Sequence, residues 1–403
     1  MDLRTQTENE KQSGMSEYQY YEFQAIDRTL TDREMTELRS YSTRAEIDRT
    51  SFVNTYNFGN FKGDPKTFME KYFDAFLYVA NWGSHELMFR LPETIISSKI
   101  AALYCGTDRC RSFSSRVKDD FVIFHFDSEE EGGDWEPGES ESLSSLIPIR
   151  SDLMSGDLRS LYLGWLLRVE KGELDNSCPE PPVPPGLGQL SASLESLVDF
   201  LRLDRDLLEV AALKSPKKEK ISPSQSSLKP WLKTIADSEK EKWLLDFLEG
   251  KNLYLRPEII QKFQDHRTGG RTAKKDKTIR RTVGQLTTEA RTLSEEKQKR
   301  AAILAEKKKK KEEEEKAKAR EQYLNDLAKR ENQAWLTVEE LFKSKRSVEY
   351  DQAVHLLKDL KDVSLKCNKP QKFQNQLKHL REQYRRKHSL MSRLDQANLT
   401  TPN

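Results

Sequence analysis

The sequence predicts an α+β N-terminal domain followed by an all-α region that contains a long charged helix and ends in a helical hairpin. Aromatic and β-branched segments alternate with helical patterns as far as Val169. A highly charged stretch then runs from Gln285 to Pro370 with no Gly or Pro in between. Of the 403 residues, 35% are hydrophobic and 33% are charged, which suits globular parts joined by a solvated segment rather than one compact body.

The first domain is predicted to contain a sheet with mixed or antiparallel pairing. Its strands are rich in aromatic and β-branched residues, and DFVIFHFD gives the strongest signal. The predicted strands are Tyr18–Ile26, Ala45–Phe58, His85–Leu91, Asp120–Asp127 and Leu143–Ile149. A helical pattern lies between the first two strands, and in it Thr31 and Glu34 have the spacing of a capping box.

A further helix is predicted to begin after Asp64. The Asp64 carboxylate can cap this helix, and Pro65 suits its first position. Its broad apolar face is predicted to contain Phe68, Tyr72, Phe73, Phe76, Leu77 and Ala80. Packing of this helix on DFVIFHFD predicts one shared core, formed by Phe73, Phe76, Leu77, Val122, Phe124 and Phe126.

The middle of the chain combines a Pro-rich linker with helical patterns. The linker PEPPVPP, Pro179–Pro185, is expected to be extended and stiff. Two short helical patterns follow in Leu190–Leu213, and another covers Trp231–Phe263. The predicted core of this last pattern is Trp231, Leu232, Trp243, Leu244, Leu245, Phe247 and Leu248.

The long helix is predicted over about Thr282–Phe342. Its middle, EKKKKKEEEEK, favours a helix because Lys and Glu lose little side-chain freedom there and pair at three- and four-residue spacings. A helix that is polar on all sides cannot lie in a core, so this one must bridge, pair or stand in solvent. A heptad of apolar residues from Leu324 to Leu341 covers fewer than three repeats, which leaves coiled-coil pairing with a second copy open.

These patterns divide the chain into five segments. They are a disordered tail (1–14), the α+β domain (15–177), the Pro-rich linker and helical region (178–266), the basic segment and long charged helix (267–345) and the helical hairpin (346–399). Charge is distributed unevenly among them. Residues 267–330 contain 21 Lys and Arg against 11 Asp and Glu, whereas 119–141 contain ten carboxylates and no Lys or Arg. The chain is therefore expected to offer one basic and one acidic surface.

The cysteines and the hydropathy favour a soluble, cytoplasmic protein. The four cysteines, at 105, 110, 178 and 367, contain no Cys-x-x-Cys motif, which argues against a disulfide framework and a zinc ribbon. No apolar run has the length of a signal peptide core or of a membrane span. We expect no cofactor and no membrane association.

Two parts of the sequence resemble known families. SEYQYYEFQAID, NFKGDP and FDAFLYVANWG resemble a family of uncharacterised bacterial proteins, over the chain from Met15 to its end. That family implies no activity. The closing segment FQNQLKHLREQYRRKHSLMSRLDQANL is similar to the helical tail of bacterial SWIM zinc-finger proteins, which implies a shared docking module. The SWIM motif, Cys-x-Cys followed by Cys-x-His, is absent from this sequence, which argues against zinc-dependent nucleic-acid binding.

A basic run before the long helix is the candidate nucleic-acid site. It consists of Arg271, Lys274, Lys275, Lys277, Arg280 and Arg281. Clustered positive charge of this kind contacts phosphates, and the helix that follows can lie along a nucleic-acid backbone. The run has no interleaved aromatic residues for base stacking, and the alternative interpretation is a solvated linker.

Two further sets of residues carry chemistry in the first domain. Strand alternation places His125 and Asp127 on one face of DFVIFHFD, where a His-x-Asp pair can bind a metal or exchange a proton; the alternative is a polar sheet face. Cys105 and Cys110 lie close to Arg109 and Arg111, whose positive charge would lower the pKa of an adjacent thiol. No base is identifiable beside these thiols, so the structural interpretation is preferred.

The leading hypothesis from the sequence is a non-enzymatic adaptor or scaffold that acts through protein–protein contacts. It follows from the uninterrupted polar helix, from the separate charged clusters and from the lack of a convincing catalytic set. The first alternative is a nucleic-acid-associated protein that binds through 271–281 and the charged helix. The second is an enzyme whose site lies near His125. Unidentified protein partners are expected, and oligomerisation through the long helix is left open.

Overall fold

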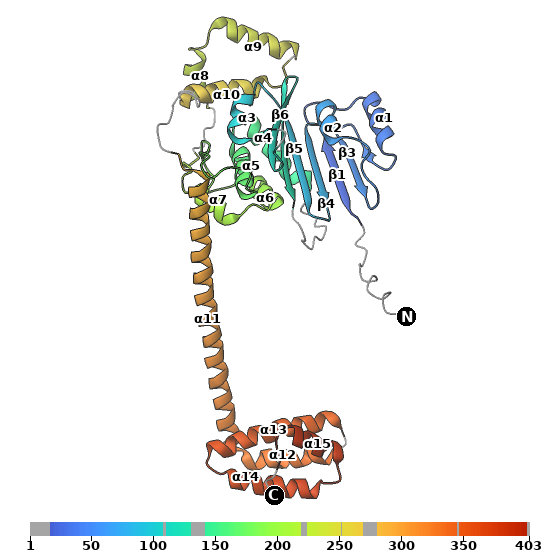
Figure 1. Ribbon diagram of the computed structural model, residues 1–403, viewed down its shortest axis with the longest axis vertical. Coiled ribbons are helices and arrows are strands. Elements are labelled where there is room, and N and C mark those ends of the chain that lie inside the picture. Colours follow the sequence, from blue (N-terminus) through green and yellow to red (C-terminus); the bar gives the residue numbers. More distant parts are fainter. Residues whose placement is uncertain are drawn as a thin grey trace, which may run out of the picture. The chain divides into compact units, whose positions relative to one another are not determined.

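A computed structural model describes residues 17–107, 110–129, 142–218, 224–250, 252–268, 280–344 and 346–400. The chain divides into two compact units, Met1–Glu296 and Lys297–Asn403. Unit 1 contains an antiparallel sheet with its helices, and unit 2 is entirely helical over its described residues (Figure 1). This arrangement confirms the fold class predicted from the sequence.

A seven-stranded antiparallel sheet organises unit 1, with the strand order β2-β3-β1-β4-β5-β7-β6. The strands are β1 (Gln19–Gln24), β2 (Glu46–Ile47), β3 (Ser51–Tyr56), β4 (Ala75–Ala80), β5 (Ser84–Pro92), β6 (Phe113–Lys118) and β7 (Phe121–Glu129). Three helices lie between strands in the sequence. Helix α1 (Asp32–Tyr41) lies between β1 and β2, α2 (Pro65–Lys71) between β3 and β4, and α3 (Ser98–Tyr104) between β5 and β6.

The sheet separates two hydrophobic cores. On one face, Val122, Phe124 and Phe126 of β7 pack against α3 and the helices that follow β7. These helices are α4 (Leu143–Met154), α5 (Arg159–Glu170), α6 (Ala192–Leu201) and α7 (Arg205–Ala212). On the other face, α1 and α2 cover the half of the sheet built from β1, β3 and β4 (Figure 1).

The local capping signals in the sequence are confirmed. The Thr31 hydroxyl accepts from Glu34 N (3.2 Å), and the Glu34 carboxylate accepts in return from Thr31 N (2.8 Å). The Asp64 carboxylate accepts from Thr67 N at 2.9 Å, with Pro65 at the first position of α2.

The predicted extent of the helix after Asp64 is wrong. Helix α2 ends at Lys71, and residues 75–80 form the central strand β4, in which every side chain is buried. The six predicted core residues are all fully buried, but Phe73 and Phe76 lie in one core and the other four lie in the second. A strand covered on both faces is a continuous apolar run, and such a run also contains helix-like spacings.

The prediction for Leu143–Ile149 is also wrong, because this segment begins helix α4. The Ser142 side chain caps the helix, and the buried residues Leu143, Leu146, Ile149 and Leu153 recur at the three- and four-residue spacing of a helix face. Pro148 lies inside this helix, near its first turn.

Three helices follow α7 in unit 1: α8 (Gln225–Leu232), α9 (Asp237–Glu249) and α10 (Leu255–Thr268). Trp231 of α8 and Phe263 of α10 are buried, with their ring centroids 5.3 Å apart. Trp243 of α9 is half-buried against Trp231, but the core prediction is wrong for the other members of the predicted set, which are exposed: Leu232, Leu244, Leu245, Phe247 and Leu248.

The long helix α11 (Val283–Lys329) begins in unit 1 and ends in unit 2. Val283 and Leu286 at its start belong to the core of unit 1, and Leu327 near its end belongs to the core of unit 2. Every residue from 295 to 323 is exposed. The charged composition of the middle of the helix thus corresponds to full exposure there.

Unit 2 contains helices α12 (Glu331–Lys343), α13 (Ser347–Lys366), α14 (Pro370–Gln383) and α15 (His388–Gln396). The predicted hairpin consists of α13 and α14, which turn at Asn368 with a φ of 56°, two residues before Pro370 begins α14. The heptad residues Leu327, Ala334 and Val338 face the core of this unit. In the described chain, these heptad positions therefore pack intramolecularly.

Truncation of Phe76 tests the assignment of this side chain to the core. The Phe76 side chain is fully buried, and its ring centroid lies 4.4 Å from that of Phe23. Phe76→Ala is expected to lower the free energy of unfolding of unit 1 by about 3–5 kcal/mol, measured by denaturant titration. Phe58→Ala is the control, because Phe58 is 81% exposed. Equal stabilities for the two variants would contradict the assignment.

Candidate functional site

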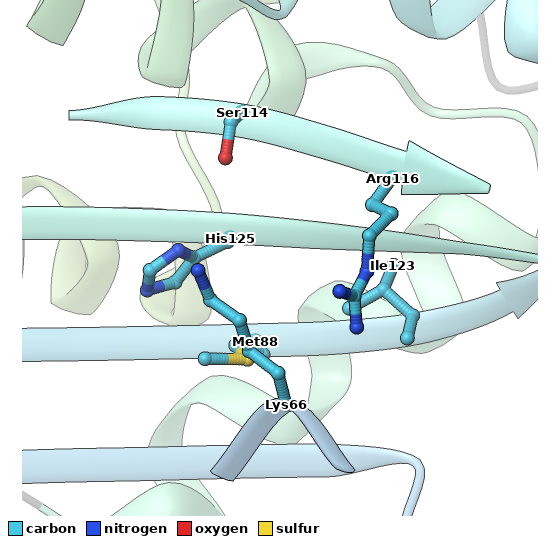
Figure 2. Close-up of a pocket in the computed structure, with 6 residues that line it drawn as sticks. All are labelled: Lys66, Met88, Ser114, Arg116, Ile123 and His125. Atoms are coloured by element: carbon cyan, nitrogen blue, oxygen red, sulfur yellow. The ribbon is translucent and has the colours of Figure 1, made fainter. Parts of the chain in front are cut away.

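A polar surface on β5, β6 and β7 is the candidate site in the first domain. It lies on the sheet face opposite Val122, Phe124 and Phe126, and His125 and Asp127 share this face as predicted. The strand register places Met88 of β5 and Ser114 of β6 beside His125, and Glu86 beside Asp127. Lys66 extends toward this surface from α2 (Figure 2).

These side chains enclose a pocket of about 80 Å³. It is lined by Lys66, Met88, Ser114, Arg116, Ile123 and His125 (Figure 2). His125 Nε2 lies 3.0 Å from Glu86 Oε2, and Arg116 forms an ion pair with Glu70 of α2. The basic groups His125 and Arg116 are thus each paired with a carboxylate of the protein.

Asp127 is the group of this surface whose titration is most strongly perturbed. Burial, with a further contribution from the negative charge of Glu86, raises the pKa of Asp127 to about 6, against the opposing charges of His125 and Lys66. The Asp127 carboxyl can therefore hold a proton up to a pH of about 6. The described residues contain no group of three or more His, Cys, Asp and Glu side chains arranged to hold a metal ion.

The two cysteines near β6 differ in their surroundings. Cys105 is buried, and its burial raises the pKa of the thiol to about 12, so the alternative of a lowered pKa does not hold for this residue. Cys110 is half-buried, with its Sγ 3.8 Å from Arg168 Nη2. Arg109 lies outside the described residues. The structural interpretation is therefore supported for Cys105.

The structure separates the two described arginines of the basic run. Arg280 is exposed, whereas Arg281 is buried. Arg271, Lys274, Lys275 and Lys277 lie outside the described residues. The prediction that Arg281 contributes to a surface for nucleic acid is therefore wrong, since its guanidinium is enclosed by the protein.

Arg281 joins the start of α11 to unit 1 through an ion pair with Glu180. Arg281 Nε and Nη2 donate to the two oxygens of Glu180, each at 2.9 Å, and Nη1 donates to Glu289 Oε2 at 3.1 Å. The Tyr162 hydroxyl donates to Glu180, and Arg281 Nη1 also donates to the carbonyl of Val210 at 3.1 Å. A bidentate arginine–carboxylate pair of this kind fixes the relative orientation of the two side chains as well as their distance.

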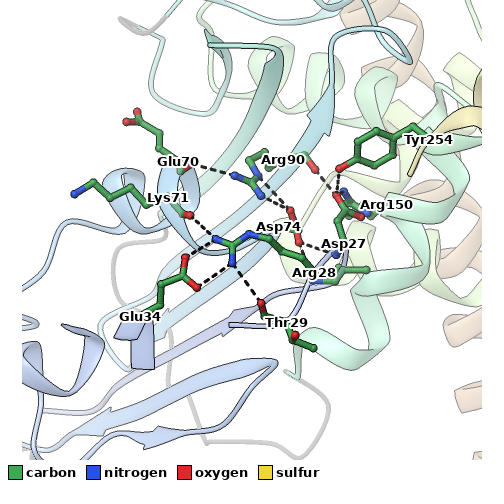
Figure 3. A network of polar contacts seen from close by, with 11 residues as sticks. Asp27, Arg28, Thr29, Glu34, Glu70, Lys71, Asp74, Arg90, Arg150 and Tyr254 are labelled. Atoms are coloured by element: carbon green, nitrogen blue, oxygen red, sulfur yellow. Dashed lines mark hydrogen bonds and ion pairs between the residues drawn. The ribbon is translucent and has the colours of Figure 1, made fainter. Parts of the chain in front are cut away.

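A second polar network, which the sequence did not reveal, joins five segments of unit 1 (Figure 3). Asp74 is fully buried, and its carboxylate accepts from Ile26 N, Asp27 N and Arg90 Nη2 at 2.7–2.9 Å. Burial alone would raise the pKa of Asp74, but the charge of Arg90 and the backbone donors hold it below its ordinary value. A single Asp inside the apolar run FDAFLYVA is the sequence signal that could have indicated this network.

The same network reaches helices α4 and α10. Asp27 Oδ2 accepts from Arg150 Nη2 of α4 and from the Tyr254 hydroxyl, each at 2.5 Å, and Arg150 Nε donates to the carbonyl of Arg90 at 2.9 Å. Tyr254 immediately precedes α10, so this contact attaches that helix to the sheet (Figure 3).

Comparisons with models of protein families, with curated proteins and with solved structures gave no match. None of the helices in the described part of the chain combines the length and the apolar composition of a membrane span.

Replacement of Asp127 is expected to have a pH-dependent effect. The folded carboxyl keeps its proton up to about pH 6, whereas the unfolded one has its ordinary pKa of 3.8. The unfolded state therefore binds fewer protons between these values, and the folded state loses stability as the pH rises through them. Asp127→Asn should melt at a higher temperature than the wild type at pH 8, with a smaller difference at pH 4. The exposed Asp120 gives the control variant Asp120→Asn, and a pH-independent effect of Asp127→Asn would contradict the perturbation.

The adjacent arginines Arg280 and Arg281 form a matched pair of test positions. Arg281→Ala leaves the Glu180 carboxylate buried without its partner, so it should lower the free energy of unfolding of unit 1 by about 3–5 kcal/mol. Arg280→Ala removes an exposed charge and should leave stability within about 0.5 kcal/mol of the wild type. Denaturant titration distinguishes these outcomes, and a stable Arg281→Ala variant would contradict the anchoring role.

Proposed function

We propose that the protein is a non-enzymatic adaptor that holds one protein partner on each of its two units. The observation that carries this proposal is that each unit has its own hydrophobic core, while α11 is exposed throughout residues 295–323. A helix whose middle is solvated on all sides acts as a spacer between the parts that it connects.

The ends of α11 are fixed by contacts that suit a spacer. At its start, Arg281 is paired with buried Glu180, and Leu286 is fully buried in the core of unit 1. Near its end, Arg320 forms ion pairs with Asp359 and Asp362 of α13, at 2.6 and 2.8 Å. Both ends of α11 are therefore held by contacts within the unit to which each end belongs.

The pocket at His125 supports an enzymatic role less well. It is small, and two of its side chains, His125 and Arg116, are already paired with Glu86 and Glu70. We place the adaptor in the cytoplasm, which is consistent with the four cysteines all being free. Association of two copies along α11 stays a prediction.

A shortened spacer tests the proposal. Deletion of residues 300–317 removes about five helical turns and keeps the relative phase of the remaining ends. Affinity purification of the full chain after nuclease treatment should recover proteins that bind each unit. The shortened chain should bind the same proteins singly but fail to hold both together, because binding at two ends depends on spacer length. Loss of all captured proteins on nuclease treatment would instead favour the nucleic-acid alternative.

Limited proteolysis provides a further prediction. The charge pairs along the exposed part of α11, such as Lys310 with Glu306, contribute only about 0.2–0.5 kcal/mol each. Trypsin should therefore cleave within residues 295–323 before it cleaves at Lys361 or Lys366 in α13, which packs in the core of unit 2. Mass spectrometry of the first fragments measures this order, and prior cleavage of α13 would argue against a weakly protected spacer.

A further inference from the structure

Helix α9 presents a row of large apolar side chains to solvent. Leu244, Leu245, Phe247 and Leu248 are 62%, 55%, 73% and 77% exposed. Leu253, shortly after the helix, is 67% exposed. Single exposed apolar residues are common on proteins, but a contiguous group of this size is typical of an interaction surface.

The side of α9 that carries Trp243 and Glu239 contacts α8 and α10, and the apolar row faces solvent. Trp243 stacks on Trp231 of α8 with ring centroids 6.1 Å apart, and Lys262 of α10 pairs with Glu239. The α10 segment is in turn attached to the sheet through Gln261 Nε2, which donates to the carbonyl of Ile95 at 2.8 Å, and through Tyr254. Helix α9 thus forms the outer layer of unit 1 on a platform made by α8 and α10 (Figure 1).

We propose that the exposed face of α9 is the docking surface of unit 1 and inserts into an apolar groove of a partner protein whose rim is basic. At about 100° per residue, the four exposed apolar side chains of α9 spread over about 160° of the helix circumference, with Phe247 at one edge and Leu245 at the other. A single helix laid alongside α9 would cover only a narrow seam, centred on Leu244 and Leu248. A groove with two walls covers the whole face, as in the binding of amphipathic helices by grooved domains.

Charge on the same face determines the chemistry of the rim. Asp237 and Glu241 are exposed and lie within about 60° of Leu244 around the helix, two turns and one turn before it, respectively. Helix α9 as a whole has five carboxylates, at 237, 239, 241, 246 and 249, against Lys240 and Lys242. This balance favours Lys and Arg on the partner, and it opposes both nucleic acid and an anionic membrane surface.

The inference rests on the proposed adaptor function, because it identifies the contact that unit 1 makes. Its test uses the full tagged chain, the double variant Leu244→Glu with Phe247→Glu, and Leu304→Glu as a control. Leu304 is 70% exposed and lies in the solvated part of α11, so its substitution changes the surface to a similar degree elsewhere. All changed side chains are exposed, and thermal melts should confirm unaltered folding.

Each chain is used to capture proteins from its native cell after nuclease treatment. Every protein captured by the wild type is then purified, and its binding to the full chains is measured by calorimetry. We expect one such protein to bind the wild type and Leu304→Glu equally, and to bind the double variant at least about 30-fold more weakly. Glu241→Lys should weaken the same complex, and added salt should do so as well. Cross-links from α9 should map to an apolar groove with basic residues at its rim.

Three results would overturn the docking surface. The first is that the captured protein binds the wild type and the double variant with equal affinity. The second is that the wild-type chain forms a concentration-dependent dimer that the double variant does not form. The third is that the wild type binds anionic phospholipid vesicles through α9. If proteins are captured and the double variant binds them normally, the inference fails while the adaptor proposal stands. If the full chain captures no protein at either unit, the adaptor proposal itself fails.

Discussion

Between residues 295 and 323, α11 has no buried side chain, and this constraint determines how the rest of the structure must be stabilised. Charge pairs on a solvated helix are weak and are screened by salt, so the contacts that fix α11 lie at its ends. At the start these are the Arg281–Glu180 pair and the burial of Val283 and Leu286, and near the other end the burial of Leu327. Each unit must consequently supply its own core, which the separate apolar clusters show.

The sheet of unit 1 illustrates which features can be predicted from a sequence. The capping residues Thr31 and Asp64 were predictable because a cap depends on neighbours within three residues. The strand β4 was not, because all six of its side chains are buried and an apolar run lacks the alternation that distinguishes a strand from a helix. The apolar residues of α9 show the converse difficulty. Their spacing predicts an amphipathic helix, but no pattern within the helix tells whether its apolar face meets the protein's own core or a partner.

The candidate site residues show the same limit for charged groups. His125 and Asp127 were placed on a shared face correctly, since strand alternation is local. Arg281 was assigned to a basic surface because it follows other cations in the sequence. Its partner Glu180 is 101 positions away, in the Pro-rich segment, and a contact at that separation leaves no trace in the local pattern. The Asp74–Arg90 pair was missed for a similar reason, although a lone carboxylate in an apolar run is a usable signal.

The central claim is that two separately stabilised units are connected by a solvated helix, and hydrogen exchange on the full chain tests it directly. Leu357→Ala, a truncation in the core of unit 2, should accelerate amide exchange throughout α12–α15 and leave the protected amides of β7 unchanged. Residues 295–323 should exchange faster than both. Slow exchange in that part of α11, or acceleration of β7 exchange by Leu357→Ala, would contradict the account.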